Sequence, residues 1–172
     1  MASLMENLID ILDEECKEYE NLLKLTISKT PVIVSEDLDE LARITDDEQL
    51  LLSRINALDK RRDEAVADIA NVLNKDVETL KIKKLIKLMA GRPAEQQALA
   101  ASYDKLMATA RQVSLINARN NELIQSALDM VHFNMNLIQS AKTAPESANY
   151  NRGAYSTGDA LGVNRKSFDA RQ

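Results

Sequence analysis

The chain has 172 residues, of which 45% are hydrophobic and 3% aromatic, and its formal net charge is −5. This length suits one domain with a core, and the scarcity of aromatic rings favours burial of aliphatic side chains at helix seams over a compact enzyme core or a β-sandwich. The acidic first half argues against nucleic acid as the main ligand, because phosphate contacts need clustered lysines and arginines.

Glycine and proline are absent from residues 32–90 and from residues 94–144. Proline removes a backbone donor, and glycine costs about 1 kcal/mol relative to alanine inside a helix, so their absence permits very long helices. We therefore predict an all-α fold. It is an elongated, coiled-coil-like antiparallel bundle of three long helices and one short helix over residues 1–144, followed by a flexible tail over residues 145–172.

The first predicted helix has apolar residues at steps of three and four, with acidic residues between them. Its stripe consists of Met5, Leu8, Leu12, Cys16, Tyr19, Leu23 and Ile27. Pro31 is expected to break or kink this helix. Cys16 is the only cysteine in the chain, which excludes an intramolecular disulfide and a zinc site made of thiolates.

The compartment is predicted from two features of the sequence. Residues 1–13 contain acidic side chains and lack a basic region ahead of an apolar core, so they do not resemble a secretion signal. No apolar run approaches the roughly 20 residues that span a bilayer. We expect a cytoplasmic protein without an integral membrane segment.

A second helix is predicted to begin at the Ser35–Leu38 segment, where Asp37 has Glu40 three residues later, as in a capping box. The spacing of its stripe averages 3.5 residues, which is typical of a coiled-coil seam. The stripe consists of Leu41, Ile44, Glu48, Leu51, Ile55, Leu58, Arg62, Ala65, Ile69 and Val72.

A short basic helix follows, with one apolar face and the four lysines Lys81, Lys83, Lys84 and Lys87. Such a helix either docks on an anionic membrane or an acidic partner, or closes one end of the bundle and offsets the acidic helices. The Gly91-Arg92-Pro93 sequence ends it, and Pro93 suits the first turn of the next helix.

The last helix is predicted over residues 94–144, and asparagines interrupt its apolar stripe. Polar groups in an apolar seam cost stability but fix register, so Asn117 and Asn120 are expected to align this helix with the others. Over residues 123–138 the apolar side chains cover roughly 220° of the helix surface, where about 100° is enough to pack against one core. Either another helix of the chain or a binding partner covers the excess.

No catalytic constellation is present in the sequence. The single histidine, His132, follows Asp129 in one Asp-x-x-His motif, which leaves a carboxylate-bridged metal pair short of ligands. There is no glycine-rich loop for phosphate, and the histidine is expected on a polar, solvated face. We predict that the chain is not an enzyme and binds no metal or cofactor.

A long acidic first helix and a short break are followed by Ser35-Glu36-Asp37-Leu38-Asp39-Glu40-Leu41, which opens the second helix. The last helix contains Asn117-Ala118-Arg119-Asn120-Asn121-Glu122-Leu123-Ile124. Together these features resemble the FlgN family of flagellar export chaperones, and the resemblance covers nearly all of the chain. The tail segment Tyr150-Asn151-Arg152-Gly153 is similar to tails of family members from Gram-positive bacteria. The chain departs from the family at Glu36, where many members have glycine, and at Pro31.

The resemblance implies a chaperone that binds the hook-associated proteins FlgK and FlgL and delivers them to the flagellar type III export apparatus. It places the client's terminal helical segment against the last long helix. The implied partner-binding residues are Asn120, Leu123 and Ile124, which match the late motif, and Ala127, Met130, Val131 and Leu137, which extend its face. Either the lysines of the basic helix or the tail are candidates for contact with the export apparatus. The alternative is a coiled-coil scaffold whose apolar excess is a dimer seam.

Overall fold

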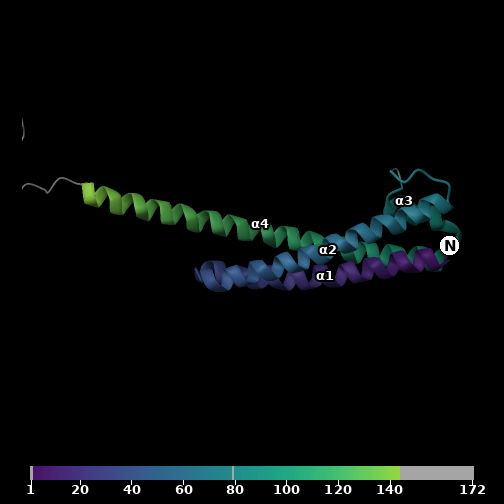
Figure 1. Cartoon of the computed structure of the whole chain (residues 1–172), viewed down its shortest axis with the longest axis horizontal. Coiled ribbons are helices and arrows are strands. Elements are labelled where there is room, and N and C mark those ends of the chain that lie inside the picture. The colour runs from purple at the N-terminus through teal and green to yellow at the C-terminus, as the bar shows by residue number, and fades with distance from the viewer. Residues whose placement is uncertain (1, 79, 144–172) are drawn as a thin grey trace, which may run out of the picture. The chain divides into compact units, whose positions relative to one another are not determined.

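The computed structural model describes residues 2–78 and 80–143, which contain four α-helices and one 3₁₀ turn and no strand. The helices are α1 (Ala2–Val34), α2 (Leu38–Val72), α3 (Ile82–Leu88) and α4 (Pro93–Thr143), and the 3₁₀ turn η1 spans Met89–Gly91 (Figure 1). The predicted all-α fold with three long helices and one short helix is confirmed. The predicted tail over residues 145–172 lies outside the described residues.

The chain divides into two units, one ending at Val131 and one beginning at His132, so the boundary falls inside α4. The first unit is an elongated bundle in which α1 and α2 lie side by side in opposite directions (Figure 1). Four ion pairs connect these two helices, and their register shows the antiparallel arrangement: Lys29–Glu48, Arg54–Glu18, Arg61–Glu14 and Arg62–Glu15. The described part of the second unit is the last part of α4.

The turn between α1 and α2 forms as the capping residues predict, except at Pro31. The Asp37 side chain accepts a 3.0 Å hydrogen bond from the Glu40 amide and caps α2. Pro31 does not break α1, which continues to Val34. Because Pro31 lies in the last turn, its missing amide removes only one helical hydrogen bond. The structure thus corrects the expected break.

The end of α1 depends on a left-handed residue. Glu36 has a φ of 57°, its amide bonds the Ile33 carbonyl, and the Asp37 amide bonds the Val32 carbonyl. This is the Schellman arrangement, in which glycine is favoured at the left-handed position. Glu36, one of the two residues that depart from the pattern of the resembled family, therefore occupies a position where glycine would be unstrained.

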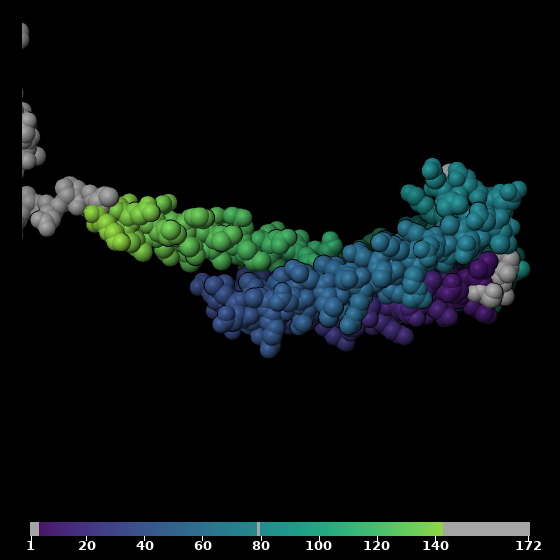
Figure 2. All heavy atoms as spheres, viewed as in Figure 1, coloured from purple at the N-terminus to yellow at the C-terminus, as the bar shows by residue number. Residues whose placement is uncertain are grey.

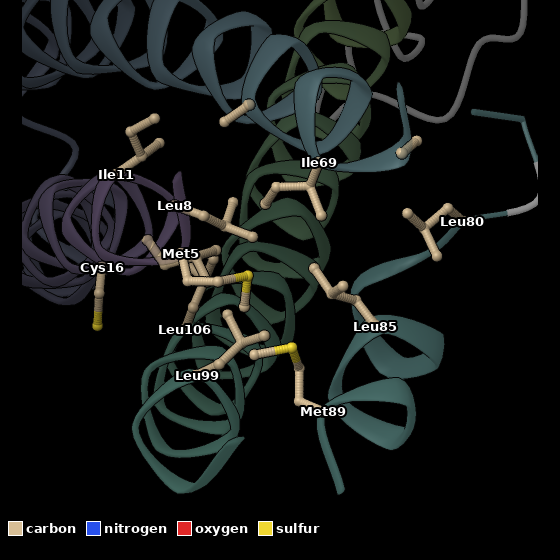
Figure 3. Packing of buried hydrophobic residues seen from close by; sticks show 13 residues of the cluster. Met5, Leu8, Ile11, Cys16, Ile69, Leu80, Leu85, Met89, Leu99 and Leu106 are labelled. Carbon is tan, nitrogen blue, oxygen red and sulfur yellow. The ribbon is translucent and has the colours of Figure 1, made fainter. Parts of the chain in front are cut away.

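The main core lies at the end of the first unit where α1 begins. Side chains from α1, α2, α3 and α4 meet there, together with Leu80 and Met89 (Figure 3). Its buried members are Met5, Leu8, Ile11, Leu12, Cys16, Ala65, Ile69, Ala70, Leu80, Leu85, Met89, Leu99 and Leu106. A smaller cluster of Leu22, Ile55 and Val113 continues the core along the three long helices.

The predicted seams are largely confirmed, and two positions are corrected. In α2 the buried residues follow the predicted stripe, but Val72 at its end is 56% exposed. In α1 the seam passes through Thr26, which is fully buried, and Ile27 is 51% exposed. The Thr26 hydroxyl donates to the Leu22 carbonyl at 2.8 Å, which satisfies it within the helix. A polar seam residue of this kind is invisible to a search for apolar periodicity.

Candidate functional site

The first part of α4 is anchored in the core, and burial ends at Asn120. Leu99, Leu106 and Val113 are at most 5% exposed. Beyond Asn120, none of the α4 side chains that the structure describes is buried. The apolar residues that follow therefore form surface and not core.

Asn120 is buried between α4 and α1 and does not face solvent. Its side-chain amide donates to the Thr26 carbonyl at 2.9 Å, and its side-chain oxygen accepts a 2.7 Å hydrogen bond from the Thr30 hydroxyl. The predicted alignment role of this asparagine is confirmed. Asn120 was also expected to contact a partner. The structure does not support this contact, because the polar atoms of its side chain are bonded within the chain and only 2% of its surface is exposed.

The other predicted partner-binding residues of the first unit lie on α4 just beyond Asn120, together with Leu128. We call this set the α4 surface, and it consists of Leu123, Ile124, Ala127, Leu128, Met130 and Val131. The first three are half-buried, whereas Leu128, Met130 and Val131 are 47%, 62% and 51% exposed. Apolar groups exposed together on one helix are typical of a site that a partner covers. The unbranched thioether of Met130 also adapts to apolar partners of varied shape.

Leu137 belongs to the second unit, where it is 58% exposed. In the same unit, Phe133, Met135 and Ile138 are also more than half exposed. The sequence placed Met135 and Ile138 on the stripe expected to pack inward. The helix lengths could have indicated this exposure. Two helices of 33 and 35 residues that pair side by side cannot cover the whole length of a helix of 51 residues.

The predicted lysines lie around α3, and all four are exposed. The apolar side of α3 faces inward, where Leu85 is fully buried and Leu80 and Met89 join the same core (Figure 3). Figure 2 shows the atoms of α3 gathered at the end of the first unit where α1 begins. The structure thus bears out the reading of this helix as a cap. Its apolar face is not available for a membrane, while its lysines remain accessible to an acidic partner.

A second polar group lies inside the bundle around Glu15 and Arg62. One guanidinium nitrogen of Arg62 donates to both carboxylate oxygens of Glu15, at 2.7 and 2.9 Å, and the other nitrogen contacts Asp59. Burial raises the pKa of Glu15 above its ordinary value, and the nearby charge of Arg62 opposes this increase. Arg62 also borders a surface cavity of about 500 Å³ whose walls include Val66, Leu80 and Tyr103. The cluster ties α1 to α2.

Over residues 2–78 and 80–143, no group of three or more histidine, cysteine, aspartate or glutamate side chains is placed to hold a metal ion. His132 is exposed on α4, as its polar neighbours predicted. No helix in this part of the chain is long and apolar enough to cross a membrane.

A family model described as FlgN protein matches residues 1–157, which include all the described helices. No curated protein and no solved structure matches the chain.

Proposed function

The chain belongs to the FlgN family of flagellar export chaperones, and from this premise we propose that it binds the hook-associated proteins FlgK and FlgL before their export. The observation that carries the proposal is the exposure of Leu128, Met130 and Val131 on α4. A terminal helical segment of the client, laid against the α4 surface, would bury these side chains. An amphipathic helix packed on an apolar helix face is a common mode of recognition.

The binding is proposed to be reversible coupled folding. The client segment orders against α4, and the entropy lost in this ordering offsets part of the contact energy. Affinity therefore stays moderate, and the export apparatus can remove the client. Leu123, Ile124, Ala127, Met130, Val131 and Leu137 are proposed to contact the client, whereas Asn120 acts by holding α4 against α1.

The role is that of a cytoplasmic binding protein without catalytic activity, metal or cofactor. Delivery requires a second contact, with the export apparatus, and we assign this contact to Lys81, Lys83, Lys84 and Lys87. These side chains are exposed, and they lie at the opposite end of the first unit from the α1–α2 turn. They can therefore meet an acidic surface while the α4 surface is occupied.

Calorimetric titration with peptides of the terminal helical segments of FlgK and FlgL tests the proposal. Wild type is expected to bind at micromolar concentration or below, and the double variant Leu123→Asp/Val131→Asp is expected to lose binding while circular dichroism shows retained helicity. The matched control is Leu50→Asp/Leu52→Asp, because these leucines of α2 are also exposed, at 56% and 46%, and lie outside the α4 surface. Absence of binding to either peptide by folded wild type would refute the proposed function.

A further inference from the structure

Two contacts fix how α1 and α4 lie beside each other in the first unit. Glu20 of α1 forms a 2.9 Å ion pair with Lys105 of α4, and Thr30 of α1 bonds Asn120 of α4 at 2.7 Å. Thr30 follows Glu20 along α1, and Asn120 follows Lys105 along α4. The two helices therefore run in the same direction. Glu20 and Lys105 lie on the two helix edges where the boundary between α1 and α4 meets solvent.

On α1, two exposed apolar residues continue the edge marked by Glu20. Ile27 and Val34 follow Glu20 at intervals of seven residues, which is nearly two helical turns, so the three side chains lie in one row. Ile27 is 51% exposed and Val34 is 68% exposed. Neither joins a buried apolar cluster of the structure.

On α4, the edge marked by Lys105 also becomes apolar. Leu123 is eighteen residues after Lys105, which corresponds to about five complete turns, and Met130 follows seven residues later. Leu123 is half-buried and Met130 is 62% exposed. The boundary between α1 and α4 is thus bridged by an ion pair near Lys105 and flanked by apolar side chains further along.

The two apolar rows follow one another along the bundle. Val34 is four residues after Thr30, and Ile124 is four residues after Asn120, so the contact between Thr30 and Asn120 brings Val34, the last residue of α1, level with Ile124. The α1 row therefore ends where the α4 row begins. We call the set of Ile27, Val34, Leu123 and Met130 the α1–α4 strip. It spans about two helical turns on α1 and then about two on α4, so a third helix could pack along both rows in turn.

Charge indicates the chemistry of the occupant. Lys24 is exposed one turn after Glu20 on α1, and Arg119 is exposed one turn before Leu123 on α4. Lys24 therefore precedes the α1 row, and Arg119 precedes the α4 row. A helix lying on the strip would gain most if it carried carboxylates beside its apolar stripe, because charges of opposite sign guide and align the docking of two surfaces.

We propose that the α1–α4 strip holds one amphipathic helix of the client, with its apolar stripe packed along the two rows in turn and its carboxylates facing Lys24 and Arg119. This inference rests on the proposed function and extends the client site from α4 to α1. In this arrangement Ile27 and Val34 contact the client directly. The client contacts both helices, and binding depends on how α1 and α4 are aligned.

The test uses the full chain and the peptides of the FlgK and FlgL terminal helical segments in a calorimetric titration. The double variant Ile27→Glu/Val34→Glu is expected to weaken binding about tenfold or more, as for contacts near the centre of an interface. Leu50→Glu, a comparably exposed leucine on α2, is expected to change affinity less than about twofold. Both α1 positions are exposed, so circular dichroism should show unchanged helicity.

Three other outcomes would overturn the inference, and they separate it from the proposed function. If Leu123→Asp/Val131→Asp abolishes binding while Ile27→Glu/Val34→Glu binds as wild type, the client lies on α4 alone and the proposed function stands. If Leu50→Glu weakens binding as much as the α1 variant, the effect is added negative charge and not contact. If folded wild type binds neither peptide, both proposals fail.

The charge component has its own measurement. Arg119→Glu is expected to weaken peptide binding by about threefold to tenfold at low salt, and the difference from wild type is expected to shrink as salt screens the interaction. Arg111→Glu is the matched control, because Arg111 is also an exposed arginine of α4 but precedes the strip by twelve residues. Equal effects of the two reversals would contradict the proposed orientation of the client's carboxylates.

Discussion

The side-chain amide of Asn120 donates a 2.9 Å hydrogen bond to the backbone carbonyl of Thr26, and this bond joins α4 to α1 at the point where burial of α4 ends. Thr30 completes the link through its hydroxyl. The same link sets the alignment of the α1–α4 strip.

Asn120→Ala is expected to lower the free energy of unfolding by about 1–3 kcal/mol, because it leaves buried polar groups of α1 without their partner. Urea denaturation followed by circular dichroism measures this change. Asn121→Ala, at an exposed neighbouring position, should change the free energy by no more than about 0.5 kcal/mol. Equal effects of the two variants would show that the hydrogen bonds of Asn120 do not stabilise the fold.

Replacing Glu15 tests the effect of burial on its carboxyl group. Because burial raises the pKa of Glu15 in the folded state, its contribution to stability is complete below the unfolded pKa and is lost as the pH rises through the folded pKa. Relative to Glu15→Gln, wild type is therefore expected to lose stability as the pH rises above about 4, the ordinary pKa of glutamate. Urea denaturation at a series of pH values gives this difference. A change of opposite sign would mean that Arg62 outweighs burial.

Glu36→Gly should stabilise the chain. At a φ of 57°, glutamate is strained and glycine is not, and the expected gain in the free energy of unfolding is about 0.5–1 kcal/mol after the greater freedom of the unfolded chain is counted. Thermal or urea denaturation measures it. Asp39→Gly, inside the first turn of α2, is the control and is expected to destabilise by about 1 kcal/mol.

A coiled-coil scaffold and a chaperone differ in the mass that the protein is expected to have in solution. For a chaperone that keeps the α4 surface free for a client, light scattering should give the mass of a monomer for wild type and for Met130→Asp/Val131→Asp. A dimer that is insensitive to salt in wild type and absent in the variant would show instead that these side chains form a seam between two copies.

Charge reversal on α3 separates delivery from client binding. Lys83→Glu/Lys84→Glu is expected to leave helicity and peptide affinity unchanged, because both lysines are exposed and the core contacts of α3 come from Ile82, Leu85 and Ile86. Secretion of the hook-associated proteins by cells that carry this variant should fall. Unchanged secretion with unchanged folding would remove α3 as the contact with the export apparatus.

Helix positions were predictable because local chemistry marks their ends. Asp37 caps α2, and Pro93 is the first residue of α4, as expected. Pro31 was misjudged because a proline in the last turn of a helix costs little, and its position relative to the end of α1 was not known in advance. The apolar periodicity predicted Ile27 in the core in place of Thr26. It counts apolar residues only, so it cannot recognise a buried threonine whose hydroxyl is hydrogen-bonded within its own helix.

The exposed apolar surface of the last helix was predictable from sequence, and its contacts with other helices were not. The wide apolar arc predicted more apolar surface than the core covers, and Met130 and Val131 are exposed there. The partners of Asn120 could not be predicted from sequence, because Thr26 and Thr30 lie about 90 residues away along the chain. Ile27 and Val34 were missed for the same reason, since their relation to Leu123 depends on how two distant helices align.

The ion pairs between α1 and α2 also bear on the order in which the chain is made. All four use residues between Glu14 and Arg62, so every partner is synthesised before the first residue of α4. Domains generally fold from the amino terminus during synthesis. The α1–α2 hairpin can therefore set its own register first and then serve as the template on which the emerging α4 finds Thr26 and Thr30.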